Sequence, residues 1–438
     1  MSGFGGGRNS GGGRGRGGRN SGGRGRGGRG RGRNNNYQGG NSNKPQVRVK
    51  HCVHFAKGTC QNGDNCQFRH VLRVHGVVDV TSPAQNNNNN NYNSNYNNNN
   101  KPGVSSVAIW ENQGAIKIFT GSKDGFWRLW NTANGQFVKE YEQNMNGEVD
   151  CLVVESNFLF CGFSSQSPAL PEVNVGMIHA WNLNNPADPP SEFHMHAMLP
   201  YAHATCTSKL IVEGTKVVSG AHDGSIRLWA FDNAANGGKG GFGLTQSLLG
   251  HAREVTGLSI AGNNLWSCST DGAIRIWDIA NGGVCQHAIT MSSGPNPQQP
   301  LGHTNAVTCL LSFTGPSGLF ILSGSLDGTV KAWNAQTGEC VGSTNNNEGV
   351  VSMSLCDDPT GSHQLLLIGL ESGSFMFRNL LPTGKIQQAF EGIMYVQSHP
   401  TWHTQAIKAL AKGPTATFYT GGSDGKMLVG QLTGDLGL

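Results

Sequence analysis

The sequence predicts an all-β fold: a seven-bladed β-propeller over residues 102–438, preceded by a small metal-stabilised domain over residues 47–74 and a disordered arm over residues 1–46. Three observations predict this order. A segment centred on Asp-Gly recurs through the C-terminal part of the chain, a Cys/His cluster with metal-ligand spacing precedes it, and the chain begins with a stretch rich in Gly, Arg and Asn. Residues 75–101, with their run of Asn, are interpreted as a linker.

The recurring segment places a Ser or Thr, an Asp-Gly pair and a Trp at fixed distances. Clear copies run over Thr120–Trp130, Ser219–Trp229, Ser267–Trp277 and Ser323–Trp333, a fifth over Thr420–Gly430 lacks the Trp, and two degenerate copies lie around Phe160–Trp181 and Leu367–Phe377. Seven such units are close to the period of roughly 40–45 residues that is typical of propeller blades. Asp-Gly between alternating apolar runs predicts a tight hairpin, so each unit is expected to be an antiparallel meander that packs between two neighbours.

The repeats resemble the WD40 family, which joins a His near the start of each blade to the Ser or Thr, the Asp and the Trp in a buried hydrogen-bonded chain. The resemblance implies three complete sets: His203, Ser219, Asp223 and Trp229; His251, Ser267, Asp271 and Trp277; and His303, Ser323, Asp327 and Trp333. Ser, His and Asp also make a catalytic triad, but a catalytic site need occur only once. Because these sets recur, we interpret them as structural.

Three blades depart from the pattern. The first has Val104 at the spacing of the His, the second has an insertion over Phe163–Val175 and no hairpin Asp, and the sixth has Glu371-Ser372-Gly373 instead of Asp-Gly and no Trp. We expect these blades to be less rigidly tied and the insertion to form a surface loop suited to partner contact. Closure is left open: residues 71–80 supply the outer strand of the last blade, or Asp435–Leu438 makes a stub and the propeller ring closes loosely.

A Cys/His cluster precedes the repeats. Cys52, Cys60, Cys66 and His70 have the spacing Cys-x7-Cys-x5-Cys-x3-His. Three thiolates and one imidazole form a closed tetrahedral set typical of one structural Zn²⁺, and so short a segment has too little core to fold without metal. With Phe55 and Phe68 among the ligands, the cluster resembles the CCCH zinc-finger family. His51 and His54 do not fit the ligand spacing and are expected to be exposed.

CCCH fingers bind single-stranded RNA through base stacking on aromatic side chains and hydrogen bonds from the backbone. Carried over to this sequence, the resemblance implies that Phe55 and Phe68 stack on bases and that Lys50, Lys57 and Arg69 lie near phosphates. The alternative is that both Phe side chains only shield the metal.

Charge is unevenly divided along the chain. Residues 1–80 hold 15 Lys or Arg and two acids, a net +13, so the remainder of the 32 basic and 27 acidic residues, 17 and 25, gives −8. The Arg-Gly segment Gly11–Arg33 has almost nothing apolar to bury, so we expect it to be disordered and to attract a polyanion. Nucleic acid is the first candidate and an anionic membrane surface the second.

These features predict an RNA-binding adaptor in which arm and finger bind RNA and the propeller binds protein partners. The combination resembles plant proteins with one CCCH finger and WD40 repeats. The alternatives are a protein-interaction scaffold with purely structural zinc and a DNA- or chromatin-binding protein. We find no phosphate loop, nucleophile elbow or open-site zinc motif, so the sequence predicts neither an enzyme nor a small-molecule substrate.

The sequence also bounds the compartment. No apolar run approaches the roughly 20 residues that span a bilayer, and the first residues do not form a secretory signal. Eleven Cys in such a chain indicate thiols or metal ligands rather than disulfides. We therefore expect a protein of the nucleus or cytoplasm that is not secreted and does not bind membranes.

Overall fold

The structure, a computed structural model, describes most of the chain from residue 53 onward. The described residues are 53–56, 61, 71–81, 101–112, 114–132, 137–167, 172–195, 199–232, 241–292, 301–315, 317–362, 364–380, 393–396 and 402–433. The chain divides into two units, Met1–Val47 and Arg48–Leu438, and every described residue belongs to the second. None of the helices in these ranges is long and apolar enough to cross a membrane.

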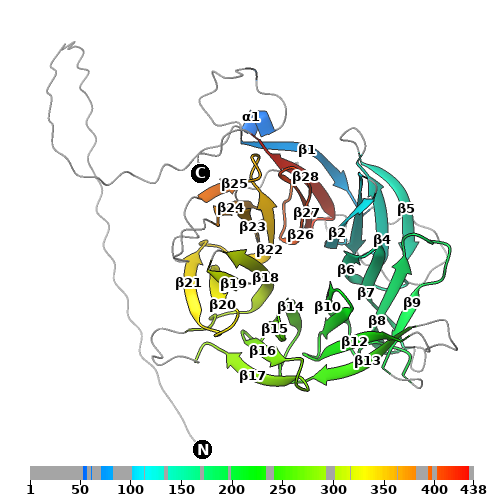
Figure 1. Cartoon of the computed structure of the whole chain (residues 1–438). Helices are drawn as coiled ribbons and strands as arrows, with labels where there is room; N and C mark the ends of the chain where they lie inside the picture. Colours follow the sequence, from blue (N-terminus) through cyan, green and yellow to red (C-terminus); the bar gives the residue numbers. More distant parts are fainter. Residues whose placement is uncertain are drawn as a thin grey trace, which may run out of the picture. The chain divides into compact units, whose positions relative to one another are not determined.

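Seven four-stranded antiparallel blades surround a common centre, each with its first strand innermost (Figure 1). The first three blades consist of β2 (Val104–Asn112), β3 (Ala115–Ser122), β4 (Phe126–Asn131) and β5 (Val138–Asn144); β6 (Val149–Glu155), β7 (Phe158–Gln166), β8 (Asn174–Asn182) and β9 (Ser191–His194); and β10 (Thr207–Glu213), β11 (Lys216–Ala221), β12 (Ile226–Asp232) and β13 (Gly241–Leu248). The fourth and fifth consist of β14 (Val255–Ala261), β15 (Asn264–Ser269), β16 (Ile274–Asp278) and β17 (Val284–Ile289); and β18 (Val307–Gly315), β19 (Gly318–Ser325), β20 (Thr329–Asn334) and β21 (Cys340–Asn345). The sixth consists of β22 (Val350–Asp357), β23 (Gln364–Leu370), β24 (Phe375–Asn379) and β25 (Ile393–Val396), and the seventh contains β26 (Ile407–Lys412), β27 (Thr417–Gly422) and β28 (Lys426–Leu432). The predicted all-β propeller is confirmed.

The propeller ring closes with a strand that precedes the repeats. β1 (Leu72–Asp79) pairs antiparallel with β28, with Leu72 opposite Leu432, and is the outer strand of the seventh blade (Figure 1). At the same end of the pair, the backbone N–H of Thr433 donates to the carbonyl oxygen of Val71 at 3.0 Å. This is the first of the two closures that the sequence left open.

The Asp-Gly turns bring neighbouring blades into contact. Gly224, Gly272 and Gly328 each have φ of +82°, a region that favours glycine. At Gly224 a Cβ would also lie 2.3 Å from the carbonyl oxygen of His251 in the next blade. Glycine is therefore required there both by the turn and by the approach of the adjacent backbone.

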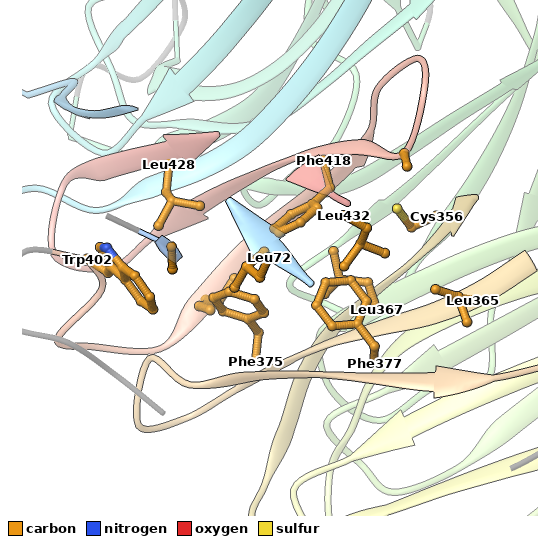
Figure 2. Close-up of a cluster of buried hydrophobic side chains, with 13 residues drawn as sticks. Leu72, Cys356, Leu365, Leu367, Phe375, Phe377, Trp402, Phe418, Leu428 and Leu432 are labelled. Carbon is orange, nitrogen blue, oxygen red and sulfur yellow. The ribbon is translucent and has the colours of Figure 1, made fainter. Parts of the chain in front are cut away.

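The core consists of seams between blades. Seven clusters of buried apolar side chains each combine residues of two adjacent blades. The cluster between the sixth and seventh blades, drawn in Figure 2, also contains Leu72 from β1 and Ala56 from α1 (Val53–Ala56). A residue that enters such a seam ties two blades together.

The second blade corrects one expectation. The insertion over Phe163–Val175 was expected to be a surface loop, but both of its ends are strand, and β7 and β8 stay paired as far as Gln166 opposite Asn174. Prolonging the hairpin satisfies backbone groups that a loop would leave to solvent. The outer strand β9 also pairs in parallel with β13, where Phe193 and Phe242 stack at 4.1 Å, so the second and third blades form one eight-stranded sheet.

Candidate functional site

The segment that carries the predicted metal ligands is attached to the propeller at both ends. α1 directly follows Cys52, and β1 begins two residues after His70. Ala56 is fully buried and shares the seam between the sixth and seventh blades with Leu72. The two ends of the segment are therefore held close together, as a single four-ligand site drawn from Cys52 to His70 requires.

The donor set fits a structural zinc ion. Cys52, Cys60, Cys66 and His70 lie outside the described residues, so the fit rests on their chemistry: three soft thiolates and an imidazole make the closed set that zinc prefers. Within the part of the chain that the structure describes, no group of three or more His, Cys, Asp and Glu side chains is arranged to hold a metal ion. The Cys/His segment therefore remains the candidate metal site.

The predicted RNA contacts remain predictions. Lys50, Lys57, Phe68 and Arg69 lie outside the described residues, and for Phe55 only the backbone, in α1, is described. His54 on the same helix is exposed, as the ligand spacing led us to expect.

The fourth blade shows the expected buried hydrogen-bonded chain in full. Trp277 Nε1 donates to Ser267 Oγ at 2.8 Å, Ser267 Oγ lies 2.8 Å from His251 Nε2, and His251 Nδ1 lies 3.0 Å from Asp271 Oδ2. With Nδ1–H donating to the carboxylate, Nε2 accepts from the Ser hydroxyl, so every group is satisfied with a neutral imidazole. The fifth blade repeats this chain through Trp333, Ser323, His303 and Asp327.

These sets are structural rather than catalytic. Ser267 is fully buried, and its oxygen is already engaged by Trp277 and His251. Burial alone would raise the pKa of Asp271, but hydrogen bonds from His251 and from the backbone N–H groups of Ala252 and Ala273 hold that pKa well below its usual range. The carboxylate is therefore held ionised by its partners, and no substrate can reach the Ser oxygen.

The third blade corrects the expected set. His203 Nε2 lies 2.6 Å from Ser219 Oγ as predicted, but its Nδ1 contacts Ser225 Oγ at 3.1 Å instead of Asp223. Asp223 is exposed and accepts the backbone N–H of Ser225 at 2.9 Å. A hydroxyl two residues after the Asp satisfies the imidazole without a charge. Burial first, and then the positive charge of Arg227, keep the pKa of His203 well below its usual value.

Sequence reasoning missed a further set in the seventh blade. His403 Nε2 lies 2.6 Å from Thr420 Oγ1, and its Nδ1 lies 3.0 Å from Asp424 Oδ1. His403 precedes Thr420 by 17 residues, whereas His251 precedes Ser267 by 16. Scanning that interval upstream of Thr420 finds the His, although the missing Trp hides the set.

The first blade replaces the His with an ion pair. Arg128, only 6% exposed at its side chain, donates to Asp124 Oδ2 at 2.8 Å, while Trp130 Nε1 donates to Thr120 Oγ1 at 2.8 Å. The expectation that this blade is loosely tied was therefore wrong, because a buried guanidinium holds the hairpin Asp in place of an imidazole.

The sixth blade is tied to the fifth by another arginine. Arg378 lies at the register position of the blade Trp, opposite Leu366, and is buried. Its Nε donates to Asn346 Oδ1 at 2.9 Å, and an Nη donates to the carbonyl oxygen of Asn345 at 3.1 Å. Burial lowers the pKa of Arg378 to about 10. The side chain nevertheless stays charged at neutral pH and connects the sixth blade to the end of the fifth.

Charged residues gather on the hairpin face, which we define as the face of the propeller ring that carries the Asp-Gly turns. Lys123 Nζ lies 3.0 Å from Glu148 Oε2 and also contacts Asp150, and His222 Nε2 lies 3.4 Å from Glu254 Oε1. Burial opposes the charged form of Lys123, but Asp150 and Glu148 outweigh it and raise the Lys pKa. Two carboxylates therefore surround the one Lys where the first and second blades meet, which disfavours a polyanion there.

Comparisons with known proteins agree with this architecture. A family model described as "WD domain, G-beta repeat" matches residues 91–131, 242–278 and 295–334. Zinc finger CCCH domain-containing protein 17 of Oryza sativa subsp. japonica is 28% identical over 206 residues, which cover 47% of this chain and 38% of that protein. Zinc finger CCCH domain-containing protein 48 of Arabidopsis thaliana is 25% identical over 213 residues, covering 49% and 40%. The chain thus spans about two fifths of the length of these curated relatives.

Among solved structures, the WD40 β-propeller domain of Doa1 is similar to this chain with a TM-score of 0.54 and 17% sequence identity. The likeness covers 77% of this chain and 95% of that one. At this identity the comparison supports the fold alone.

Proposed function

We propose that this chain, which carries WD40 repeats and whose curated relatives are zinc finger CCCH domain-containing proteins, is an RNA-binding adaptor. The arm and the Cys/His segment bind single-stranded RNA, and the propeller presents a rigid surface to protein partners. One observation carries the proposal. Ala56 and Leu72 pack into one seam of the propeller, so whatever the Cys/His segment binds is held at a fixed place on the scaffold.

The binding element would be organised by zinc. Cys52, Cys60, Cys66 and His70 would hold one Zn²⁺, which supplies a structural crosslink and no reaction. Phe55 and Phe68 would then be available to stack on bases, and Lys50, Lys57 and Arg69 would lie near phosphates.

The distribution of charge supports nucleic-acid binding by the N-terminal region and protein binding by the propeller. Residues 1–80 carry a net +13 and the rest of the chain −8. On the hairpin face, Glu148 and Asp150 both pair with Lys123, and Glu254 lies beside His222. A polyanion is attracted to the first region and repelled by the second, which leaves the hairpin face to protein partners.

The test is fluorescence anisotropy of the full chain with labelled single-stranded RNA and DNA oligomers, with and without a zinc chelator and across a salt series. We expect RNA to bind more tightly than DNA. Chelation or Cys66→Ser should weaken RNA binding by about tenfold or more, because the loss of ordered stacking residues costs on the order of 1–3 kcal/mol per base. Cys285→Ser, which removes a partly exposed thiol on β17, is the matched control.

Other results would favour different functions. Binding that depends on salt but is indifferent to chelation and to Cys66→Ser assigns RNA contact to the arm alone. The seam that contains Ala56 also favours a second candidate, a protein-interaction scaffold in which zinc only stiffens the segment. That candidate predicts no zinc-dependent nucleic-acid binding, whereas equal zinc-dependent affinity for DNA identifies a DNA-binding protein.

A further inference from the structure

We propose that Ala56 and Leu72 are positioning residues that couple binding at the Cys/His segment to closure of the propeller ring. Metal or RNA bound at the segment stabilises the seventh blade, and an intact seventh blade strengthens that binding. The inference rests on the proposed function, because it takes the Cys/His segment to be the metal- and RNA-binding element.

The seam between the sixth and seventh blades includes residues that precede the repeats. Of the 13 buried residues in this cluster, 11 follow the first blade in the sequence and belong to the sixth and seventh blades, and the other two, Ala56 on α1 and Leu72 on the closing strand β1, precede the repeats. Figure 2 shows Leu72 among the rings of Phe375 and Phe418 and the side chain of Leu432. Ala56 is 0% exposed and Leu72 is 1% exposed. Both ends of the Cys/His segment are thus part of the propeller core rather than attached to its surface.

The strand β1 closes the propeller ring. It covers β28, which without β1 would be an unpaired edge. Buried residues also flank β1 on both sides: Val71 is 2% exposed before it, and Val80 is 2% exposed after it. Beyond Val80, the hydroxyl of Thr81 donates to the carbonyl oxygen of Pro102 at 3.1 Å, at the entrance to the first blade. Displacing β1 therefore opens the seventh blade on both of its neighbours.

Docking of both ends in the seam lowers the entropy cost of metal binding. Only 15 residues separate Ala56 from Leu72, and three of the four predicted ligands lie among them. When the seam holds both ends, the segment has already lost much of the conformational entropy that assembling the ligands costs. A ligand that binds only this closed form must stabilise it in return, because linkage between two equilibria is reciprocal.

The helix α1 offers a matched pair of substitutions. Ala56 faces the seam and is fully buried, whereas His54, two residues earlier, is exposed. Ala56→Asp places a charge in the apolar seam, and His54→Asp places the same side chain in solvent two residues closer to Cys52. A difference between the two variants reports on docking in the seam rather than on charge near the ligands.

The experiment uses the full chain and Zn²⁺ as the probe. Zinc affinity is measured by competition with a chromophoric chelator, and the unfolding midpoint of the propeller is followed by Trp fluorescence with and without zinc. We expect zinc to raise the midpoint. Ala56→Asp should lower zinc affinity by about tenfold, a usual size for coupled sites, and remove the rise. His54→Asp should leave zinc affinity within about twofold.

Hydrogen exchange on the unsubstituted chain provides a second measurement, which does not depend on a variant that folds. Zinc is expected to slow exchange of the backbone amides of β1 and β28 and to leave β15 in the fourth blade unchanged. Zinc binding with no change in the midpoint, or in exchange at β1, overturns the coupling while leaving the proposed RNA-binding function intact. Failure of the chain to bind zinc at all overturns both.

Discussion

The fifth and seventh blades fill the same place in their cores from opposite strands. In the fifth, Ile321 on β19 lies opposite Trp333 on β20. In the seventh, Phe418 on β27 lies opposite Gly430 on β28. A Cβ on Gly430 would lie only 2.2 Å from Phe418 Cζ, so the Phe ring occupies the space that a Trp would enter. The large aromatic side chain has moved to the second strand, and its partner has shrunk to glycine.

Blade packing therefore depends on the cross-strand pair as a unit rather than on the Trp alone. The blades that keep the Trp and its hydroxyl partner have an aliphatic residue opposite the Trp: Ile118, Val217, Leu265 and Ile321. The exchange also leaves no side-chain donor unsatisfied. The Phe418 side chain has no N–H, and Thr420 Oγ1 keeps its hydrogen bond to His403.

Restoring the Trp of the repeat at position 430 alone should lower the stability of the propeller more than any other substitution considered for the blades. Gly430→Trp should destabilise the propeller by about 4 kcal/mol, at the upper end for overpacking, because even the new Cβ meets the Phe418 ring. Phe418→Ile combined with Gly430→Trp should recover most of that loss and add the bond from the indole N–H to Thr420. Chemical denaturation of the single and double variants gives the coupling free energy. Simple additivity of the two single effects contradicts the pairwise view.

The first blade differs from the fifth in its polar contacts, because an ion pair takes the place of the His–Asp pair. Arg128→Met should cost about 3 kcal/mol, since it leaves the Asp124 carboxylate without its guanidinium in a site that is 14% exposed. The control is Arg253→Met, at an exposed position, which should change the free energy of unfolding by less than about 0.5 kcal/mol. Equal effects of the two substitutions in urea unfolding would show that the ion pair contributes nothing.

Much of the fold follows from the sequence because the repeat carries its own register. Ser267, Asp271 and Trp277 are spaced so that one hairpin brings them together, and Gly272 supplies the positive φ that the turn needs. The strand β1 carries no such motif. It lies beside β28 because the seventh blade has no fourth strand of its own. The alternation of apolar and polar residues around Leu72 does not show which blade that is.

The candidate site was less predictable for a different reason. Motif spacing identifies Cys52 and His70 as ligands, but it cannot show that Ala56 enters a propeller seam, since a lone Ala carries no pattern. The sequence also does not show when one polar side chain replaces another as a hydrogen-bond partner. Ser225 takes the role expected of Asp223 because a hydroxyl happens to lie within 3.1 Å of His203, a distance set by packing in three dimensions.

The hairpin Asp should contribute to stability in the fourth blade but hardly in the third, and this difference should depend on pH. At neutral pH, Asp271→Ala should cost about 2 kcal/mol, because it leaves His251 Nδ1 buried without an acceptor. Asp223→Ala should cost less than about 0.5 kcal/mol, because Asp223 is exposed and His203 is bound by Ser225.

The pKa of Asp271 is lower in the folded state than in the unfolded state. Its contribution to stability is therefore complete above the unfolded pKa of about 3.9 and is lost as the pH falls through the folded pKa. The gap in unfolding free energy between the two variants should therefore be full at pH 7 and smaller under strongly acidic conditions. If the difference in unfolding free energy between the two variants stays constant or grows as the pH falls, the stabilisation comes from packing and not from the carboxylate.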